Sequence, residues 1–279
     1  MRALQRICAA AALALAVTGM STAANAQMGI GANFWNIAWE GTSDYYQSGI
    51  SWATVTDPWK PAFLTDCEPY PVLRFMDWCM PLQGSGDNGI WAQRTPKTAV
   101  QDQSSSRAVA YEWMIDLCNR LDKDMWICVP TMADTNYSYQ LALLIESLLE
   151  PGRRVFVEYT NEHWNYDASW YNQQGAAMGF SGDATTQGDY YYTYRSVQVW
   201  RQFERVFGQN SPRIVKFLGA FAVNVSIAGH MFAALNNAEV NPTGVTADAV
   251  GIAPYMRGSD VAGCVAELGN KYQEARNHL

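Results

Sequence analysis

Metal-binding motifs are scarce in this sequence. Its 279 residues include six Cys, with no CxxC pair, and only three His. The three, His163, His230 and His278, share no spacing typical of a metal site. This scarcity argues against a zinc or iron centre, and we expect neither a metal nor an organic cofactor.

Phosphate-binding glycine motifs and charged residues are also few. No GxGxxG opens a helix after the first expected strand, and GxxxxGK[ST] does not occur, which disfavours a nucleotide-binding protein. Charged residues make up 16% of the chain and the net charge is −7. This acidic balance argues against a nucleic-acid or anionic-membrane partner. With 49% hydrophobic residues, the chain fits neither a disordered protein nor a collagen or coiled coil.

Long hydrophobic runs are missing except at the N-terminus. Arg2 and Arg6 precede an apolar stretch at residues 7–17, and Ala24-Asn25-Ala26 has the small-x-small form of a cleavage site. We therefore expect a signal peptide over residues 1–26 and a secreted or periplasmic mature protein. Once the signal is removed, no remaining run is long enough for a membrane span, so no membrane partner is expected.

Export permits disulfides, but only some of the cysteines are good candidates for one. Cys67 and Cys79 flank an expected strand and are the best candidates for a pair. The alternative is that both remain thiols. Cys118 and Cys128 lie in apolar contexts, where buried thiols are expected.

Short apolar runs alternate with amphipathic stretches after residue 27. The runs are at residues 30–37, 71–76, 125–130, 154–159, 214–221 and 249–253. Helical patterns lie at residues 110–121, 141–149, 200–207 and 261–272. Continuous apolar runs are typical of parallel strands buried on both faces. The alternation predicts an α/β fold, with one domain over residues 27–279.

The most informative segment is residues 154–165, an apolar strand that ends in Asn161-Glu162 and enters an aromatic loop. Glycoside hydrolysis needs a carboxylic acid that protonates the leaving oxygen. Glu162 at the strand end could supply it, with Asn161 binding a hydroxyl. Alternatively, Glu162 could cap the following loop or pair with an Arg. Glu158 lies deeper in the strand and is expected to pair with a cation such as Arg74, because a buried charge needs a partner.

The strand-ending Asn-Glu resembles the fourth-strand motif of clan A glycoside hydrolases, which are retaining (β/α)8 TIM-barrel enzymes. The resemblance implies that Glu162 is the general acid/base and that Asn161 binds a substrate hydroxyl. Residues 71–78 look like the clan's second strand, which makes Arg74 the residue that supports the nucleophile. Ala253-Pro254-Tyr255 looks like the end of the sixth strand, so Tyr255 is expected near the nucleophile.

Two departures from the clan pattern affect this interpretation. His163 follows Glu162 where many clan families have Pro. The resemblance also implies a nucleophilic Glu at the end of a seventh strand, whereas we count about six strand-helix units before Leu279. Glu267 and Glu274 lie in a helical pattern and do not fit the role. We therefore expect a barrel domain that lacks its C-terminal part, and a chain that is inactive alone.

Tryptophan is abundant near the expected strand ends. Trp35, Trp78 and Trp164 lie among polar residues there, and an apolar pocket with a few convergent polar groups is the general form of a ligand site. We assign these three to substrate contact, although core packing is the alternative for each one. Trp113, Trp126 and Trp200 lie on helical patterns or within strands, and we assign them to packing.

The sequence therefore leads to two functional hypotheses. The first is a secreted glycosidase acting on a β-linked polysaccharide or oligosaccharide. The second is a non-catalytic carbohydrate-binding protein on a barrel that lacks the nucleophile, since a fold does not guarantee its usual activity. A reading frame that continues into another strand ending in Glu would favour the enzyme. The oligomeric state stays open.

The signal-peptide prediction can be checked by intact mass. We expect secreted protein to begin at Gln27, with its N-terminus open to cyclisation to pyroglutamate. Exported protein that retains Met1 to Ala26 would contradict both the export hypothesis and the argument that disulfides are permitted.

Overall fold

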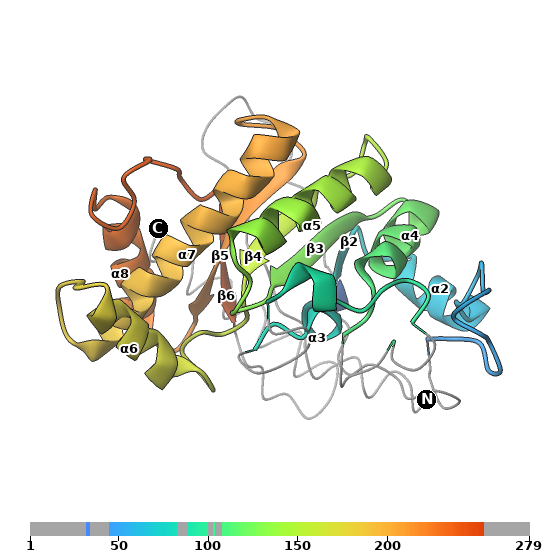
Figure 1. Ribbon diagram of the computed structural model, residues 1–279, viewed down its shortest axis with the longest axis horizontal. Coiled ribbons are helices and arrows are strands. Elements are labelled where there is room, and N and C mark those ends of the chain that lie inside the picture. The colour runs from blue at the N-terminus through green and yellow to red at the C-terminus, as the bar shows by residue number, and fades with distance from the viewer. Residues whose placement is uncertain (1–31, 34–44, 83–88, 100–102, 104–107, 254–279) are drawn as a thin grey trace.

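The structure is a computed structural model that describes residues 32–33, 45–82, 89–99, 103 and 108–253 (Figure 1). Within these residues, six parallel strands form one sheet in the order β1-β2-β3-β4-β5-β6. The strands are β1 (Ala32–Asn33), β2 (Val72–Arg74), β3 (Asp124–Val129), β4 (Val155–Tyr159), β5 (Ile214–Phe221) and β6 (Ala249–Ala253).

Helices connect the strands and lie outside the sheet. They are α2 (Pro61–Cys67), α3 (Met76–Cys79), α4 (Tyr111–Leu121), α5 (Thr135–Leu148), α6 (Ala168–Ala177), α7 (Ala184–Phe207) and α8 (Val225–Leu235), with a 3₁₀ turn η1 at Trp91–Gln93. Figure 1 shows α4, α5 and α7 lying across one face of the sheet. Sequential parallel strands with helices on the outside form a half-barrel, so the predicted α/β fold of partial TIM-barrel type is confirmed.

Helix capping explains why two helices begin earlier than their apolar patterns indicate. The Asp134 carboxylate accepts a hydrogen bond from the Tyr137 amide at 2.6 Å, which starts α5 six residues before its apolar stripe. The Asp183 carboxylate accepts from the Thr186 amide at 2.8 Å, which starts α7. Both satisfy amide groups that the first turn of a helix leaves without partners.

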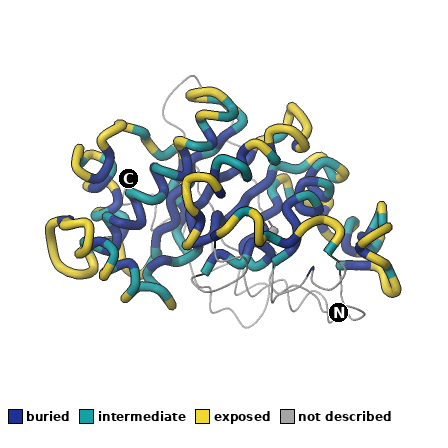
Figure 2. The backbone as a smooth tube through the Cα atoms, viewed as in Figure 1, coloured by how far each residue is buried: buried dark blue, intermediate teal, exposed yellow. Residues whose placement is uncertain are grey.

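The sheet separates two hydrophobic cores. The larger core fills the space between the sheet and the helices. The smaller core lies on the opposite, concave face, which is the barrel lumen, and consists of Trp126, Phe156, Phe217 and Ala249. Val157, which alternates with Phe156, faces the helices instead, and its carbonyl accepts a hydrogen bond from the Trp200 indole at 2.9 Å. Figure 2 shows the strands as the buried centre and the peripheral loops as the exposed parts.

The candidate disulfide between Cys67 and Cys79 is not present. Both residues are buried thiols, and no disulfide joins them. Strand β2 lies between them in the chain, so Cys67 at the end of α2 precedes the strand while Cys79 in α3 follows it. Burial raises the pKa of the Cys67 thiol to about 12, which keeps it protonated. Cys118 and Cys128 are buried thiols, as predicted.

Two expected elements fall largely outside the described residues. Only Ala32–Asn33 of the first expected strand is described, and the expected helix at 261–272 is not. Among the described helices, none has the length and apolar character needed to cross a membrane.

Helices α6 and α7 pack at a glycine, and this contact gives a test of the fold. A Cβ on Gly175 would lie 2.0 Å from the carbonyl oxygen of Gln187 in α7. We expect Gly175→Ala to force the two helices apart and to lower the free energy of unfolding by about 1–3 kcal/mol. Urea unfolding followed by circular dichroism measures this loss.

Gly229 provides the matched control. It lies in exposed backbone within α8, and a Cβ there would meet nothing within 4 Å. Gly229→Ala should therefore stabilise the protein by about 0.5–1 kcal/mol, because alanine is the better helix former. Equal effects of the two substitutions would contradict the close helix contact.

Candidate functional site

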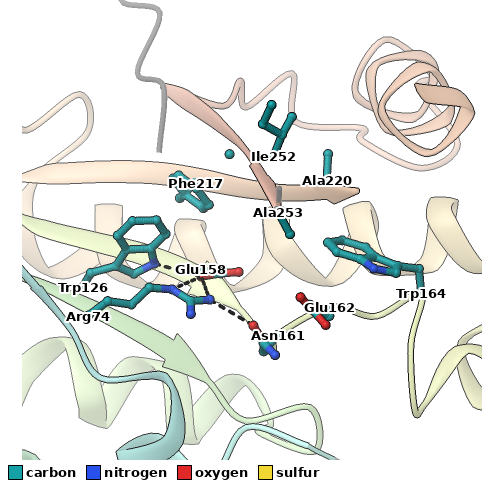
Figure 3. Close-up of a pocket in the computed structure, with 12 residues that line it drawn as sticks. Arg74, Trp126, Glu158, Asn161, Glu162, Trp164, Phe217, Ala220, Ile252 and Ala253 are labelled. Atoms are coloured by element: carbon teal, nitrogen blue, oxygen red, sulfur yellow. Dashed lines mark hydrogen bonds and ion pairs between the residues drawn. The ribbon is translucent and has the colours of Figure 1, made fainter. Parts of the chain in front are cut away.

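A pocket opens at the carboxyl ends of the strands, on the lumen side of the sheet (Figure 3). Each of strands β2 to β6 contributes one residue or more to its lining: Arg74, Trp126, Glu158, Gly219 and Gly251 are examples. The loop after β4 contributes Asn161, Glu162 and Trp164. In parallel α/β folds, ligands bind at this end of the strands.

A buried ion pair forms the floor of the pocket. The Arg74 guanidinium donates to Glu158 Oε2 from Nη2 at 2.8 Å and from Nε at 3.3 Å. Glu158 Oε2 also accepts from the Trp126 indole at 2.8 Å and from the Cys128 thiol at 3.3 Å. Both charged side chains are almost fully buried. The predicted pairing of Glu158 with Arg74 is confirmed.

The same guanidinium orients Asn161. Arg74 Nη2 donates to Asn161 Oδ1 at 3.0 Å, which turns the amide carbonyl toward Arg74 and its NH2 group away (Figure 3). Burial alone would lower the pKa of Arg74. Cys128 and the carboxylates of Glu158 and Glu162 outweigh that effect and raise the pKa above its usual value. Arg74 therefore stays charged and links the floor of the pocket to its mouth.

The backbone around Asn161 is strained. Thr160 and Glu162 have φ angles of 56° and 49°, in the left-handed region that non-glycine residues rarely adopt. Each such residue costs on the order of 1–3 kcal/mol, and outliers of this kind cluster at functional sites. The sequence contains no glycine here that would have revealed this turn.

Hydrogen bonds to the neighbouring strand hold the strained turn. The Thr160 amide donates to the Val129 carbonyl at 2.8 Å, and the Thr160 hydroxyl lies 2.7 Å from that of Thr131. The Tyr159 hydroxyl donates to the Thr131 carbonyl at 2.8 Å. These buried contacts fix the end of β4, so the following residues leave the strand in one direction.

The turn brings Glu162 to the mouth of the pocket. Its side chain is half-buried and lies between Asn161 and Trp164 in Figure 3. Glu162 Oε2 accepts a hydrogen bond from Asn165 Nδ2 at 3.1 Å, and the Glu162 carbonyl accepts from the Asn165 amide at 2.8 Å. The carboxylate thus contacts its own loop, which was the alternative expected from the sequence, while it also lines the pocket.

An aromatic pair forms one wall beside Glu162. The Trp164 ring stacks on Phe221 with centroids 5.6 Å apart and planes 10° apart, and both side chains are half-buried. Trp164 lines the pocket. A half-exposed indole beside a carboxylate offers a flat apolar surface next to a proton donor or acceptor.

Trp126 is a site residue that the sequence analysis assigned to packing alone. It packs in the lumen core, but its indole also binds Glu158, and the Arg74 guanidinium lies 5.0 Å from the centroid of its ring. Arg74 and Trp126 are directly paired positions on β2 and β3, and this register is visible only in the structure. Trp113 and Trp200 are fully buried, as their assignment to packing predicts.

The assignment of Trp78 to substrate contact is corrected. Trp78 is fully buried in an aromatic cluster, where it stacks on Trp59 with centroids 5.9 Å apart. The chain turns into helix α3 directly after β2, so the Trp78 ring packs into the outer core and not toward the pocket. Trp35 and Tyr255 lie outside the described residues.

Comparisons with known proteins provide no family for this site. No protein-family model, curated protein or solved structure matches the chain. Within the part of the chain that the structure describes, no group of three or more His, Cys, Asp or Glu could hold a metal ion.

The buried ion pair can be tested by removing its cation. Arg74→Met leaves the Glu158 carboxylate buried without its counter-charge, which typically costs about 3–5 kcal/mol. Neutralising the carboxylate as well, in Arg74→Met with Glu158→Gln, should recover at least about 1 kcal/mol of that loss. Urea unfolding of the three proteins measures both effects.

A surface pair serves as the control. Arg154 contacts Asp124 at 2.7 Å, but its side chain is 52% exposed, and exposed pairs contribute about 0–1 kcal/mol. Arg154→Met should therefore change stability much less than Arg74→Met. Similar losses of unfolding free energy from the two substitutions would show that the lumen pair contributes no more to stability than a surface pair.

Proposed function

We propose that this protein is an exported glycoside hydrolase that acts on a β-linked polysaccharide or oligosaccharide by a retaining mechanism. Glu162 is the general acid/base, and Asn161 binds a substrate hydroxyl beside the scissile bond. One observation carries the proposal: at the carboxyl end of β4, Glu162 stands at the mouth of a pocket between an Asn oriented by a buried Arg and a half-exposed Trp.

The chemistry of the site supports a role in acid catalysis. A general acid must reach the leaving oxygen, so its carboxyl group has to be accessible from the pocket. Both Glu162 and Glu158 line the pocket, but Glu162 is half-buried at its mouth, whereas Glu158 is buried at its floor. The Trp164 ring beside Glu162 suits the flat C–H face of a sugar, and the Asn161 amide suits its hydroxyls.

The proposal also requires a second carboxylate, about 5–5.5 Å from the first in retaining enzymes. Glu158 is the other carboxylate among the described lining residues, and Arg74, Trp126 and Cys128 all bind its Oε2. An anion stabilised in this way is a poor nucleophile. The nucleophile therefore has to come from outside the described residues.

The same observation favours a second candidate, a non-catalytic carbohydrate-binding protein. Such a protein would use Trp164 and Asn161 to bind the sugar and would need no nucleophile. Binding and turnover distinguish the two candidates. The binder retains affinity for glycans without hydrolysing them, and loses affinity on Trp164→Ala.

The enzyme hypothesis predicts a specific result for Glu162→Gln. This substitution should preserve the fold and lower kcat by about 10²–10⁴-fold, the usual contribution of general acid–base catalysis. The loss should be smallest for aryl glycosides with good leaving groups, which need little protonation. Steady-state kinetics over a series of leaving groups measures this dependence.

Glu146 offers the matched control, because it is an exposed Glu on helix α5. Glu146→Gln makes the same chemical change and should leave kcat unchanged. An equal loss on all leaving groups would assign Glu162 to substrate positioning. Near-normal turnover of natural glycans by Glu162→Gln would remove Glu162 from the site.

A further inference from the structure

The residue after Glu162 is a buried histidine with an unusual set of contacts. The His163 ring stacks on Tyr192 of helix α7, with centroids 3.9 Å apart and planes 9° apart. Its Nε2 lies 2.8 Å from Asp189 Oδ1, also on α7. His163 therefore attaches the turn that carries Glu162 to the longest helix of the described fold.

Asp189 is shared between two histidines. Its carboxylate is almost fully buried, with Oδ1 at His163 and Oδ2 at 2.8 Å from Nδ1 of His230 on helix α8. The two contacts join α7 to different elements. His163 lies in the loop after β4, and His230 lies on α8. Only His163 is next to Glu162 in the chain.

The buried ring is expected to be neutral, with its proton on Nε2. Nδ1 of His163 is buried and makes no hydrogen bond within the described residues, so a second ring proton would have no acceptor there. Burial lowers the pKa of His163, and this outweighs the opposite effect of Asp189. His163 Nε2–H therefore donates to the Asp189 carboxylate.

Tyr192 connects helix α7 to the neighbouring strand of the pocket as well. Its hydroxyl accepts a hydrogen bond from the Gly219 amide of β5 at 2.9 Å, and Gly219 lines the pocket. One turn of α7 thus holds β5 through Tyr192 and the β4 loop through His163. The same helix therefore positions two of the segments that line the pocket, the β4 loop and β5.

We propose that Asp189 is a positioning residue that acts through His163 to fix the direction in which Glu162 enters the pocket. The proposal rests on the proposed function of Glu162. The strained turn needs an anchor on each side of Glu162. Thr160 is held by β3 on the upstream side, and Asp189 holds the downstream side through His163.

Asp189→Asn tests this role by removing the charge that His163 binds, with little change in volume. We expect kcat to fall by about 10–100-fold on substrates with poor leaving groups, as for other small misplacements of a catalytic group. Substrates with good leaving groups should lose less. In a Glu162→Gln background, Asp189→Asn should change kcat by less than about twofold, because the effect acts through Glu162.

His230→Gln is the matched control, because His230 binds the other oxygen of the same carboxylate. It should leave kcat within about threefold of wild type. His163→Phe is a second variant if Asp189→Asn folds poorly. It keeps an aromatic ring against Tyr192 but removes the N–H donor, and it should reproduce the kinetic pattern of Asp189→Asn.

Amide hydrogen exchange of residues 160–165 tests the anchor without any turnover. We expect exchange there to rise at least about tenfold in Asp189→Asn and to stay unchanged in His230→Gln. Unchanged exchange in Asp189→Asn would overturn the positioning role. Equal increases in both variants would overturn it as well, because Asp189 would then act by joining α7 to α8.

The two proposals can fail separately. Absence of turnover that depends on Glu162 in the wild-type protein would remove the proposed function, while the exchange result would still decide whether Asp189 holds the turn. If Glu162-dependent turnover is present, additive effects of Asp189→Asn and Glu162→Gln would overturn the positioning role alone.

Discussion

The site depends on one ion pair in the barrel lumen. Arg74 and Glu158 come from strands that are not neighbours, because β3 lies between them. Their contact closes over Trp126 of β3, which binds the same carboxylate oxygen. Taking two charges out of water is costly unless further hydrogen bonds satisfy them, and the indole, the thiol of Cys128 and the amide of Asn161 supply these. The lumen is therefore organised by polar contacts as much as by its small apolar core.

The ion pair also contacts the carboxyl-terminal edge of the sheet, where the candidate site lies. Arg74 contacts Glu158 at the pocket floor and Asn161 at the mouth, so one buried side chain joins the floor to the amide that it orients. Helix α7 also positions the pocket, from outside the sheet, because Asp189 contacts the β4 loop and Tyr192 contacts β5. The β4 turn is thus fixed from the lumen side and from the helix side.

The strands and the ion pair were readable from the sequence, but the turn was not. Residues 214–221 and 249–253 are apolar runs bounded by polar residues, and they form β5 and β6 as predicted. Glu158 in an apolar strand had to find a cation, which made Arg74 a reasonable partner. Positive φ angles at Thr160 and Glu162 depend on hydrogen bonds to Thr131 and Val129, which are distant in the chain. No local pattern encodes them. Trp78 was misassigned because proximity to a strand end does not tell which core a ring enters.

The left-handed backbone at Glu162 opposes the stability of the fold to the proposed role of its side chain. Gly or Asn adopts this backbone conformation more easily than Glu or Thr, so replacing Glu162 with either would relieve strain and stabilise the folded chain. The same replacement removes the carboxylate on which the proposed chemistry depends. Thr160 differs, because its hydroxyl is part of the buried contact with Thr131 and its loss would offset the relief. A library of this protein selected only for thermal stability would therefore drift toward Gly or Asn at Glu162 and accumulate stable variants that lack the proposed acid/base carboxylate.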